Sequence, residues 1–131
     1  MVWNLPISIK GIVLNSKDEI ILLKNERNEW ELPGGRIEEG EKPEETLMRE
    51  IYEELGIYCT AEKLIDVWIY EVLPSKHIFI VTYLCTIYNL QNITISSEHI
   101  DYQWFTIYEL EKINIPEGYK ISIRKLMDNT F

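Results

Sequence analysis

The sequence has few of the features that place a chain in a membrane or on a nucleic acid. Its 13 basic residues are outnumbered by 22 acidic ones, which gives a formal net charge of −9. An acidic balance of this size argues against a broad surface for nucleic acid or for anionic lipid. No apolar run reaches the roughly 20 residues that a membrane-spanning helix needs. We therefore expect neither a nucleic acid nor a membrane as a partner.

Cysteine is also scarce, which excludes a scaffold held together by disulfides. Cys59 and Cys85 lie far apart in apolar segments, and the sequence contains no CxxC pair. We expect both to be reduced thiols in the core, as is usual for cytoplasmic proteins. The first residues, MVWNLPISIK, lack the charged start and long apolar stretch of a secretory signal. These features predict a cytoplasmic location.

The apolar content is sufficient for one hydrophobic core. Hydrophobic residues make up 46% of the 131 residues, and no repeat or low-complexity linker interrupts them. A chain of this length usually folds around a single core. We expect one domain over residues 1–131, either as a monomer or as a homodimer.

Hydrophobic periodicity and turn residues predict a strand-rich chain with two principal helices. Strands are expected at Pro6–Leu14, Glu19–Lys24, Glu29–Pro33, Lys63–Val72, Lys76–Tyr88 and Gln103–Thr106. Helices are expected at Pro43–Leu55 and Glu117–Met127, with a short helical turn at Ile107–Lys112. The apolar pattern of the last helix is carried by Ile121, Ile123, Lys125, Leu126 and Met127. This order is neither a regular alternation of strands and helices nor all-β, and it indicates an α/β protein.

One segment, Gly35–Ile57, concentrates acidic residues at regular spacing, with the sequence GRIEEGEKPEETLMREIYEELGI. The Pro-Gly-Gly run at 33–35 signals a turn before it. Pro43 suits a first helical turn, and Gly56 is a suitable helix stop. The segment is therefore expected to be a loop that leads into the helix Pro43–Leu55.

Three glutamates fall on one face of this helix. Glu50, Glu53 and Glu54 occupy positions i, i+3 and i+4, so their carboxylates project in similar directions. An adjoining apolar stripe is formed by Leu47, Ile51 and Leu55. Like charges at this spacing destabilise a helix by about 0.2–0.5 kcal/mol per pair, and a divalent cation would relieve that repulsion. Carboxylate oxygens are ligands that Mg²⁺ and Mn²⁺ prefer. The alternative to a metal site is a solvated acidic face, on which Arg49 forms surface ion pairs.

The segment resembles the Nudix box, the signature of the Nudix hydrolases. Every specified position is filled, namely Gly35, Glu41, Arg49, Glu50, Ile51, Glu53, Glu54, Gly56 and Ile57. The resemblance covers a small part of the chain but fixes many positions in one window. It implies an α/β/α sandwich around a central mixed sheet. It also implies metal-dependent hydrolysis of a diphosphate linkage in a nucleoside diphosphate derivative.

The resemblance assigns roles to individual residues. Glu53, Glu54 and the Gly34 carbonyl would be metal ligands, and Glu50 would be a ligand or the general base. Arg49 would hold a glutamate in place, and Glu41 would support the loop and helix. Mg²⁺ is the implied metal, with Mn²⁺ as an alternative. A further acid is expected from a later loop, where Glu98 is the first candidate and Asp101 the second.

Residues other than the specified positions of the box would choose the substrate. Arg36, Arg27 and Lys24 are candidates for phosphate contacts, although Arg27 and Lys24 are equally well explained as surface cations. Five aromatic residues could stack on a base, but strand alternation already explains most of them as core: Trp3, Trp68, Tyr70, Phe79 and Tyr83. Trp104 is also expected in the core. His77 is expected to be solvated, and His99 is a candidate for assisting at the site.

The substrate itself stays open at this stage. A small-molecule nucleotide is expected, and a damaged or non-canonical nucleoside triphosphate ranks first. The alternatives are ADP-ribose, a nucleotide sugar or a dinucleoside polyphosphate. Two hypotheses from other classes are a Nudix-type module that senses a nucleotide without hydrolysing it, and an acidic structural protein.

Overall fold

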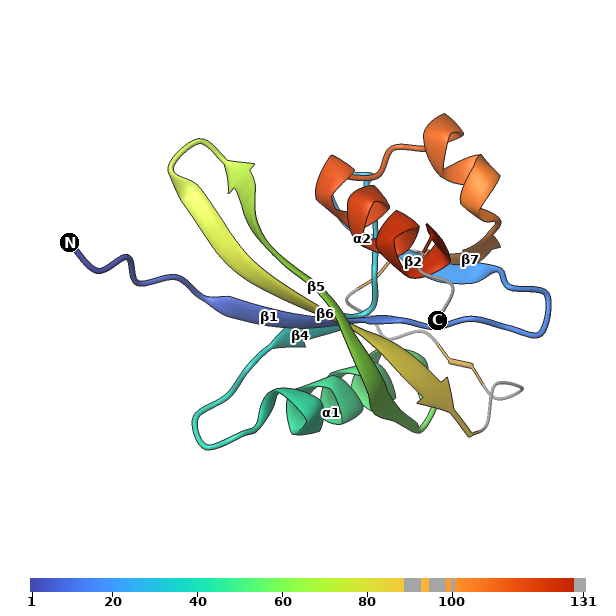
Figure 1. The fold of residues 1–131 in the computed structure, drawn as a ribbon, viewed down its shortest axis with the longest axis horizontal. Helices are drawn as coiled ribbons and strands as arrows, with labels where there is room; N and C mark the ends of the chain where they lie inside the picture. The colour runs from blue at the N-terminus through green and yellow to red at the C-terminus, as the bar shows by residue number, and fades with distance from the viewer. Residues whose placement is uncertain (89–92, 95–98, 100, 129–131) are drawn as a thin grey trace.

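The computed structural model describes residues 1–88, 93–94, 99 and 101–128, which form two β-sheets with a helix on either side of the larger one (Figure 1). The larger sheet has the order β4 (Gly34–Arg36), β1 (Ile7–Ile12), β6 (Lys76–Ile87) and β5 (Cys59–Leu73). The smaller sheet has the order β3 (Trp30–Glu31), β2 (Ile20–Lys24) and β7 (Asp101–Phe105). The helices are α1 (Pro43–Leu55), the 3₁₀ helix η2 (Ile107–Lys112) and α2 (Glu117–Asp128).

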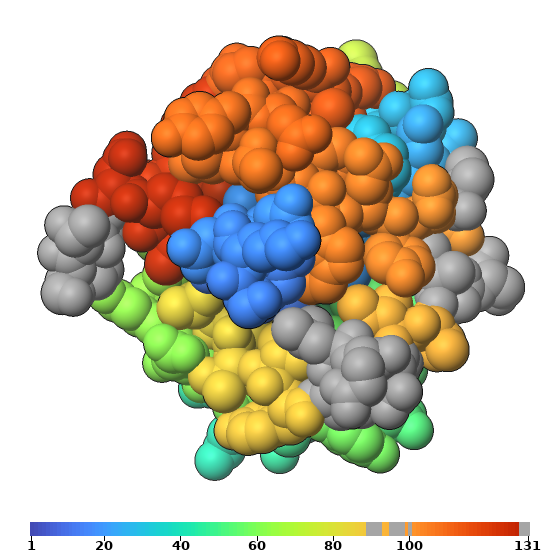
Figure 2. Space-filling view, turned by 90° about the vertical axis from the view of Figure 1, so that its right-hand side faces the viewer, coloured from blue at the N-terminus to red at the C-terminus, as the bar shows by residue number. Residues whose placement is uncertain are grey.

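The larger sheet is mixed, as expected. Strand β1 runs parallel to β6 and antiparallel to β4, and β5 pairs antiparallel with β6. The smaller sheet is antiparallel throughout and was not predicted as a separate unit. Residues distant in sequence also form one surface, where the turn between β1 and β2 (blue) lies beside the chain around η2 (orange) and the end of β6 (yellow; Figure 2). The α/β fold class is confirmed.

Strand β1 supplies side chains to both faces of the larger sheet. Ile9 and Val13 pack in one buried cluster with Leu47 of α1, whereas Ile12 packs in the other cluster with Tyr119 of α2. Successive side chains of a strand point to opposite faces, so one strand can contribute to two cores. This arrangement places α1 and α2 on opposite sides, as in the expected α/β/α sandwich.

Helix α1 has the predicted bounds. Pro43 occupies its first turn, and Gly56 ends it in the left-handed region with φ of 69°. The Gly56 N–H donates to the Tyr52 carbonyl at 2.8 Å. The predicted apolar stripe is fully buried, so the glycine stop and the core face together fix the position of the helix.

The Pro-Gly-Gly turn predicted at 33–35 is wrong in part, because Gly34–Arg36 forms strand β4. Gly34 has φ of 142°, and a Cβ atom there would lie 2.0 Å from the Ile9 carbonyl oxygen. Glycine therefore allows the box to enter as a strand pressed against β1. Strand β5 is also longer than predicted, since it begins at Cys59 rather than Lys63.

The buried face of α2 differs from the predicted one. Its buried residues are Tyr119, Ser122 and Ile123, whereas Ile121 is 45% exposed. Lys125 donates instead to the buried carboxylate of Asp66 at 2.7 Å. Asp66 also accepts a hydrogen bond from the Ser122 hydroxyl at 2.7 Å. Polar contacts, and not only apolar ones, thus attach α2 to β5.

Several smaller expectations were also tested. Both cysteines are free and buried, as predicted. Trp104 is partly buried against the core beside α1, in line with its expected role. Trp3 is the exception among the five aromatic residues, most of which were expected in the core, since it is 58% exposed and its ring lies edge-on to His77. Within the described residues, no helix is long and apolar enough to cross a membrane.

We expect Asp66→Ala to lower the free energy of unfolding by about 1–3 kcal/mol, because it leaves the buried Ser122 hydroxyl without its acceptor. Urea unfolding of Asp66→Ala, of Ser122→Ala and of the double variant would measure these free energies. The double variant with Ser122→Ala should be less destabilised than the sum of the single variants. Strict additivity would contradict the coupling between the two side chains.

Candidate active site

The carboxylates of α1 meet the backbone of β4. Glu54 is 4% exposed, and its Oε1 accepts a hydrogen bond from the Gly34 N–H at 2.6 Å. Glu50 lies against Gly35, where a Cβ atom would be 2.3 Å from the carboxyl carbon of Glu50. Both glycines therefore allow carboxylates from the helix to reach the strand backbone. Glu53 lies further out, with its side chain 56% exposed.

Arg49 joins the loop of the box to its helix. Its Nε donates to Glu41 Oε2 at 2.6 Å, and one terminal nitrogen donates to Glu50 Oε1 at 2.8 Å. The other terminal nitrogen donates to the Arg36 carbonyl at 3.0 Å. The hydrogen bond from Arg49 is the main cause that lowers the pKa of Glu41 to about 2. These contacts agree with a supporting position for Glu41, and they offset the repulsion between the helix carboxylates.

A second charged cluster includes Glu54 itself. His99 Nε2 is 3.4 Å from Glu54 Oε2 and 3.2 Å from Glu31 Oε1. The other carboxylate oxygen of Glu31 is 3.6 Å from Lys10 Nζ. The structure thus brings His99 to the site, as sequence reasoning allowed. Lys10 and Glu31 were not predicted, although a lysine within the apolar strand ISIKGIVL and a glutamate just before the Pro-Gly-Gly run were usable signals.

Burial controls the charge states in this cluster. Burial raises the pKa of Glu54 to about 7, although Lys10 and the Gly34 N–H act in the opposite direction. Burial would also raise the pKa of Glu31, but Lys10 and His99 outweigh it and lower this pKa to about 2. Burial opposes the charge on Lys10, yet Tyr119 and Glu31 raise its pKa above the usual range. Lys10 is therefore a permanent cation and Glu31 a permanent anion at neutral pH.

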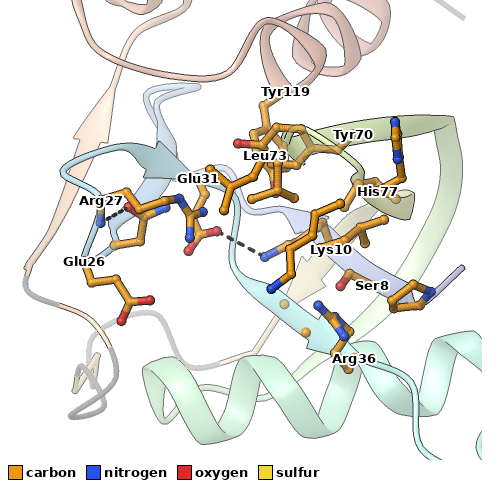
Figure 3. A pocket seen from close by; sticks show the side chains of 18 of the residues that line it. Ser8, Lys10, Glu26, Arg27, Glu31, Arg36, Tyr70, Leu73, His77 and Tyr119 are labelled. Atoms are coloured by element: carbon orange, nitrogen blue, oxygen red, sulfur yellow. Dashed lines mark hydrogen bonds and ion pairs between the residues drawn. The ribbon is translucent and has the colours of Figure 1, made fainter.

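A cavity of about 990 Å³ opens beside these groups, and Figure 3 shows side chains of both sheets and of α2 around it. Arg27 and Arg36, two of the predicted phosphate contacts, line it. Lys24 is not among its described lining residues, and its Nζ lies 5.2 Å from the centre of the Trp30 ring. His77, expected to be solvated, is half-buried and lines the cavity.

Of the two candidates for a further acid, the structure describes Asp101, which is not among the described residues that line this cavity. Glu98 lies outside the part of the chain that the structure describes. Asp101 is exposed at the first position of β7, where its Oδ1 accepts from the Tyr102 N–H at 2.8 Å. The structure therefore leaves the role of Glu98 as a prediction and gives Asp101 a local backbone contact.

The described residues contain no cluster of three acidic, histidine or cysteine side chains close enough to form a metal site. Arg49 pairs with Glu50 and Glu53, and His99 Nε2 lies 3.4 Å from Glu54 Oε2. The available donors are carboxylate oxygens beside the backbone of Gly34. That donor chemistry fits a hard divalent cation such as Mg²⁺.

Comparisons with known proteins agree with the fold and with the box. A family model described as the NUDIX domain matches residues 5–126. The uncharacterized Nudix hydrolase YvcI of Bacillus subtilis is 30% identical over 115 residues, covering 84% of this chain and 72% of that protein. The 8-oxo-dGTP diphosphatase of Escherichia coli is 38% identical over 73 residues, covering 52% of this chain and 56% of that protein. The crystal structure of a MutT protein from Methanosarcina mazei matches with a TM-score of 0.85 and 25% identity, covering 99% of this chain and 100% of that one.

We expect the metal-free protein to lose stability as the pH rises from about 4.5 through about 7, the range over which Glu54 retains its proton only when folded. The folded protein then binds more protons than the unfolded chain, so the free energy of unfolding falls with pH. The pKa of His99 is also raised in the folded protein, so its titration likewise lowers the free energy of unfolding as the pH rises. Glu54→Gln should make this fall in the free energy of unfolding smaller by on the order of 2 kcal/mol.

Urea unfolding at pH 5 and pH 8 in the presence of a chelator would measure the effect. Glu44→Gln, an exposed position on the same helix, is the matched control and should keep the wild-type slope. Parallel pH profiles for the wild type and Glu54→Gln would show that Glu54 is not the responsible group.

Proposed function

We propose that this chain, which belongs to the Nudix hydrolase family, is a Mg²⁺-dependent pyrophosphohydrolase. Its preferred substrate is a damaged or non-canonical nucleoside triphosphate, which it converts to a nucleoside monophosphate and pyrophosphate. The observation that carries the proposal is the contact of Glu54 with Gly34 at the edge of the 990 Å³ cavity. A cavity of this size can hold a nucleotide, and its edge places acidic oxygens where a diphosphate can lie.

The acidic residues of α1 share the work of holding the metal and activating water. The carboxylates of Glu53 and Glu54, with the Gly34 carbonyl, would hold Mg²⁺. When bound, Mg²⁺ supplies positive charge that stabilises the phosphate oxygens during displacement. Glu50 orients the attacking water and accepts its proton. Burial raises the pKa of Glu50, which brings it closer to the pH at which a carboxylate is an effective base.

Arg49 positions this base. It donates to Oε1 of Glu50, and its contact with Glu41 fixes the guanidinium in turn. A charge-assisted hydrogen bond of this kind restricts the carboxylate to one orientation. Arg49 therefore acts through Glu50 and Glu41 and does not need to touch the substrate.

Cations in the cavity suit a polyphosphate substrate despite the acidic composition of the chain. Arg36 follows the glycines of the box, and Arg27 lines the same cavity, so both can donate to phosphate oxygens. Similarity to the Escherichia coli 8-oxo-dGTP diphosphatase supports a nucleoside triphosphate as the first candidate, over about half of each chain. ADP-ribose and nucleotide sugars are the alternatives that the same diphosphate chemistry would admit.

We expect Glu53→Gln and Glu54→Gln each to lower turnover by at least about a hundredfold, because each removes a negative oxygen from the cation site. Release of pyrophosphate from a panel of nucleoside triphosphates, with Mg²⁺ and with Mn²⁺, would measure this. Glu44→Gln changes the same charge at an exposed position of the same helix and should retain activity.

Unchanged turnover in both variants, with the fold intact by circular dichroism, would contradict the assignment. The panel should also contain ADP-ribose and a nucleotide sugar, with ¹⁸O-labelled water to identify the phosphorus attacked. Nucleotide binding without phosphate release from any substrate would favour the sensing module over the enzyme.

A further inference from the structure

The cavity contains a charged pair that the proposed diphosphate chemistry does not use. Lys10 of β1 and Glu31 of β3 both line the cavity, with side chains only 9% and 16% exposed. Figure 3 shows Lys10 extending between Glu31 and the side of the cavity that carries Ser8 and Arg36. Buried ion pairs often stabilise a protein no better than apolar side chains of similar size. The presence of Lys10 in the mainly apolar strand β1, opposite Glu31 of β3, therefore calls for a role in binding.

The pair offers both hydrogen-bond donors and hydrogen-bond acceptors to a ligand. A lysine ammonium has three donors, and Glu31 is its single ion-pair partner among the described residues. A carboxylate can accept about four hydrogen bonds. One oxygen of the Glu31 carboxylate lies 3.2 Å from His99 Nε2, and the other lies 3.6 Å from Lys10 Nζ. Unused donors of Lys10 and unused acceptor positions of Glu31 therefore remain side by side.

The remaining surroundings of the pair suit a flat ring. Apolar and aromatic side chains from β5, β6 and α2 line the same cavity, namely Tyr70, Leu73, Ile78, Ile80 and Tyr119. Lys10 pairs in register with Gly34, so the charged pair lies next to the part of the box that would meet the diphosphate. Proteins that bind isolated bases stack them on such side chains and read their edges by hydrogen bonds.

We propose that Lys10 and Glu31 read the edge of the substrate base and select a 6-oxopurine, with guanine preferred. The inference rests on the proposed function, which places the diphosphate at Gly34 and Gly35. Guanine presents a carbonyl oxygen for the Lys10 ammonium, followed by two adjacent N–H groups for the Glu31 carboxylate. The match uses both charged groups at once.

Other bases match this pair less completely. Adenine offers only one exocyclic amino group beside a ring nitrogen, and its third edge position is a C–H. Uracil carries a second carbonyl beside its N3–H, which would oppose the Glu31 carboxylate, and the single carbonyl of cytosine is followed by an unprotonated ring nitrogen instead of an N–H. A site built around polar groups rejects ligands that leave those groups unpaired. The expected order therefore places guanine first and hypoxanthine, which lacks the 2-amino group, second.

The test is equilibrium binding of GMP, IMP and AMP, measured by calorimetry in Mg²⁺. The wild type should bind GMP at least about tenfold more tightly than AMP, as one well-placed polar pair commonly gives. Lys10→Met keeps the length of the side chain but removes its donors. It should weaken the binding of GMP and of IMP about tenfold or more, and it should change the binding of AMP by less than about threefold. Lys17→Met, in the exposed turn after β1, is the charge-matched control.

Three results would overturn the proposal. The first is equal binding of GMP and AMP by the wild type, a comparison that requires no variant. The second is an equal loss for all three nucleotides in Lys10→Met, which would indicate a phosphate contact or a structural role. The third concerns the double variant of Lys10→Met with Glu31→Gln, which removes both charges and therefore leaves neither unpaired. It replaces Lys10→Met if the single variant unfolds. Retained selectivity in this variant would show that the pair does not read the base.

The same measurements separate this inference from the proposed function. Selective binding of GMP without phosphate or pyrophosphate release from any substrate of the panel would reject the hydrolase and keep the recognition pair. Equal hydrolysis of GTP and ATP, with equal binding of their monophosphates, would keep the hydrolase and reject the pair.

Discussion

The hydrogen bond from the Gly34 N–H to Glu54 is the contact on which the arrangement of the site depends. It joins helix α1 to strand β4, and β4 in turn is pressed against β1 at a point where a side chain on Gly34 would collide with the backbone of Ile9. Through this contact a carboxylate from the helix reaches the strand and the cavity beside it. The site therefore depends on close packing of backbone as much as on the acidic residues themselves.

Paired charges allow an acidic chain to form a cavity suited to an anionic substrate. Arg49 holds the loop and helix of the box together. In the second charged cluster, His99 and Lys10 approach Glu31. Buried carboxylates repel one another and resist ionisation, and the cations Arg49 and Lys10 offset that repulsion.

Sequence reasoning succeeded where the signal is local. Pro43, Gly56 and the apolar stripe of α1 specified a helix with the observed bounds, because caps and periodicity act within a few residues. It failed at Ile121, which the pattern placed in the core, because the packing of α2 against β5 decides which face is buried. It also missed Lys10, since the importance of a strand lysine appears only when a distant glutamate lies opposite.

The sequence by itself determined the Nudix family, the acidic helix face and the reaction class, because the box contains those residues in one short window. Only the tertiary structure decided which of the candidate cations line the cavity. Arg27 and Arg36 line the cavity whereas Lys24 does not. Lys10, Glu31 and Tyr119 come together from β1, β3 and α2, and no spacing within the chain encodes that meeting. Long-range packing brings their side chains together around one cavity.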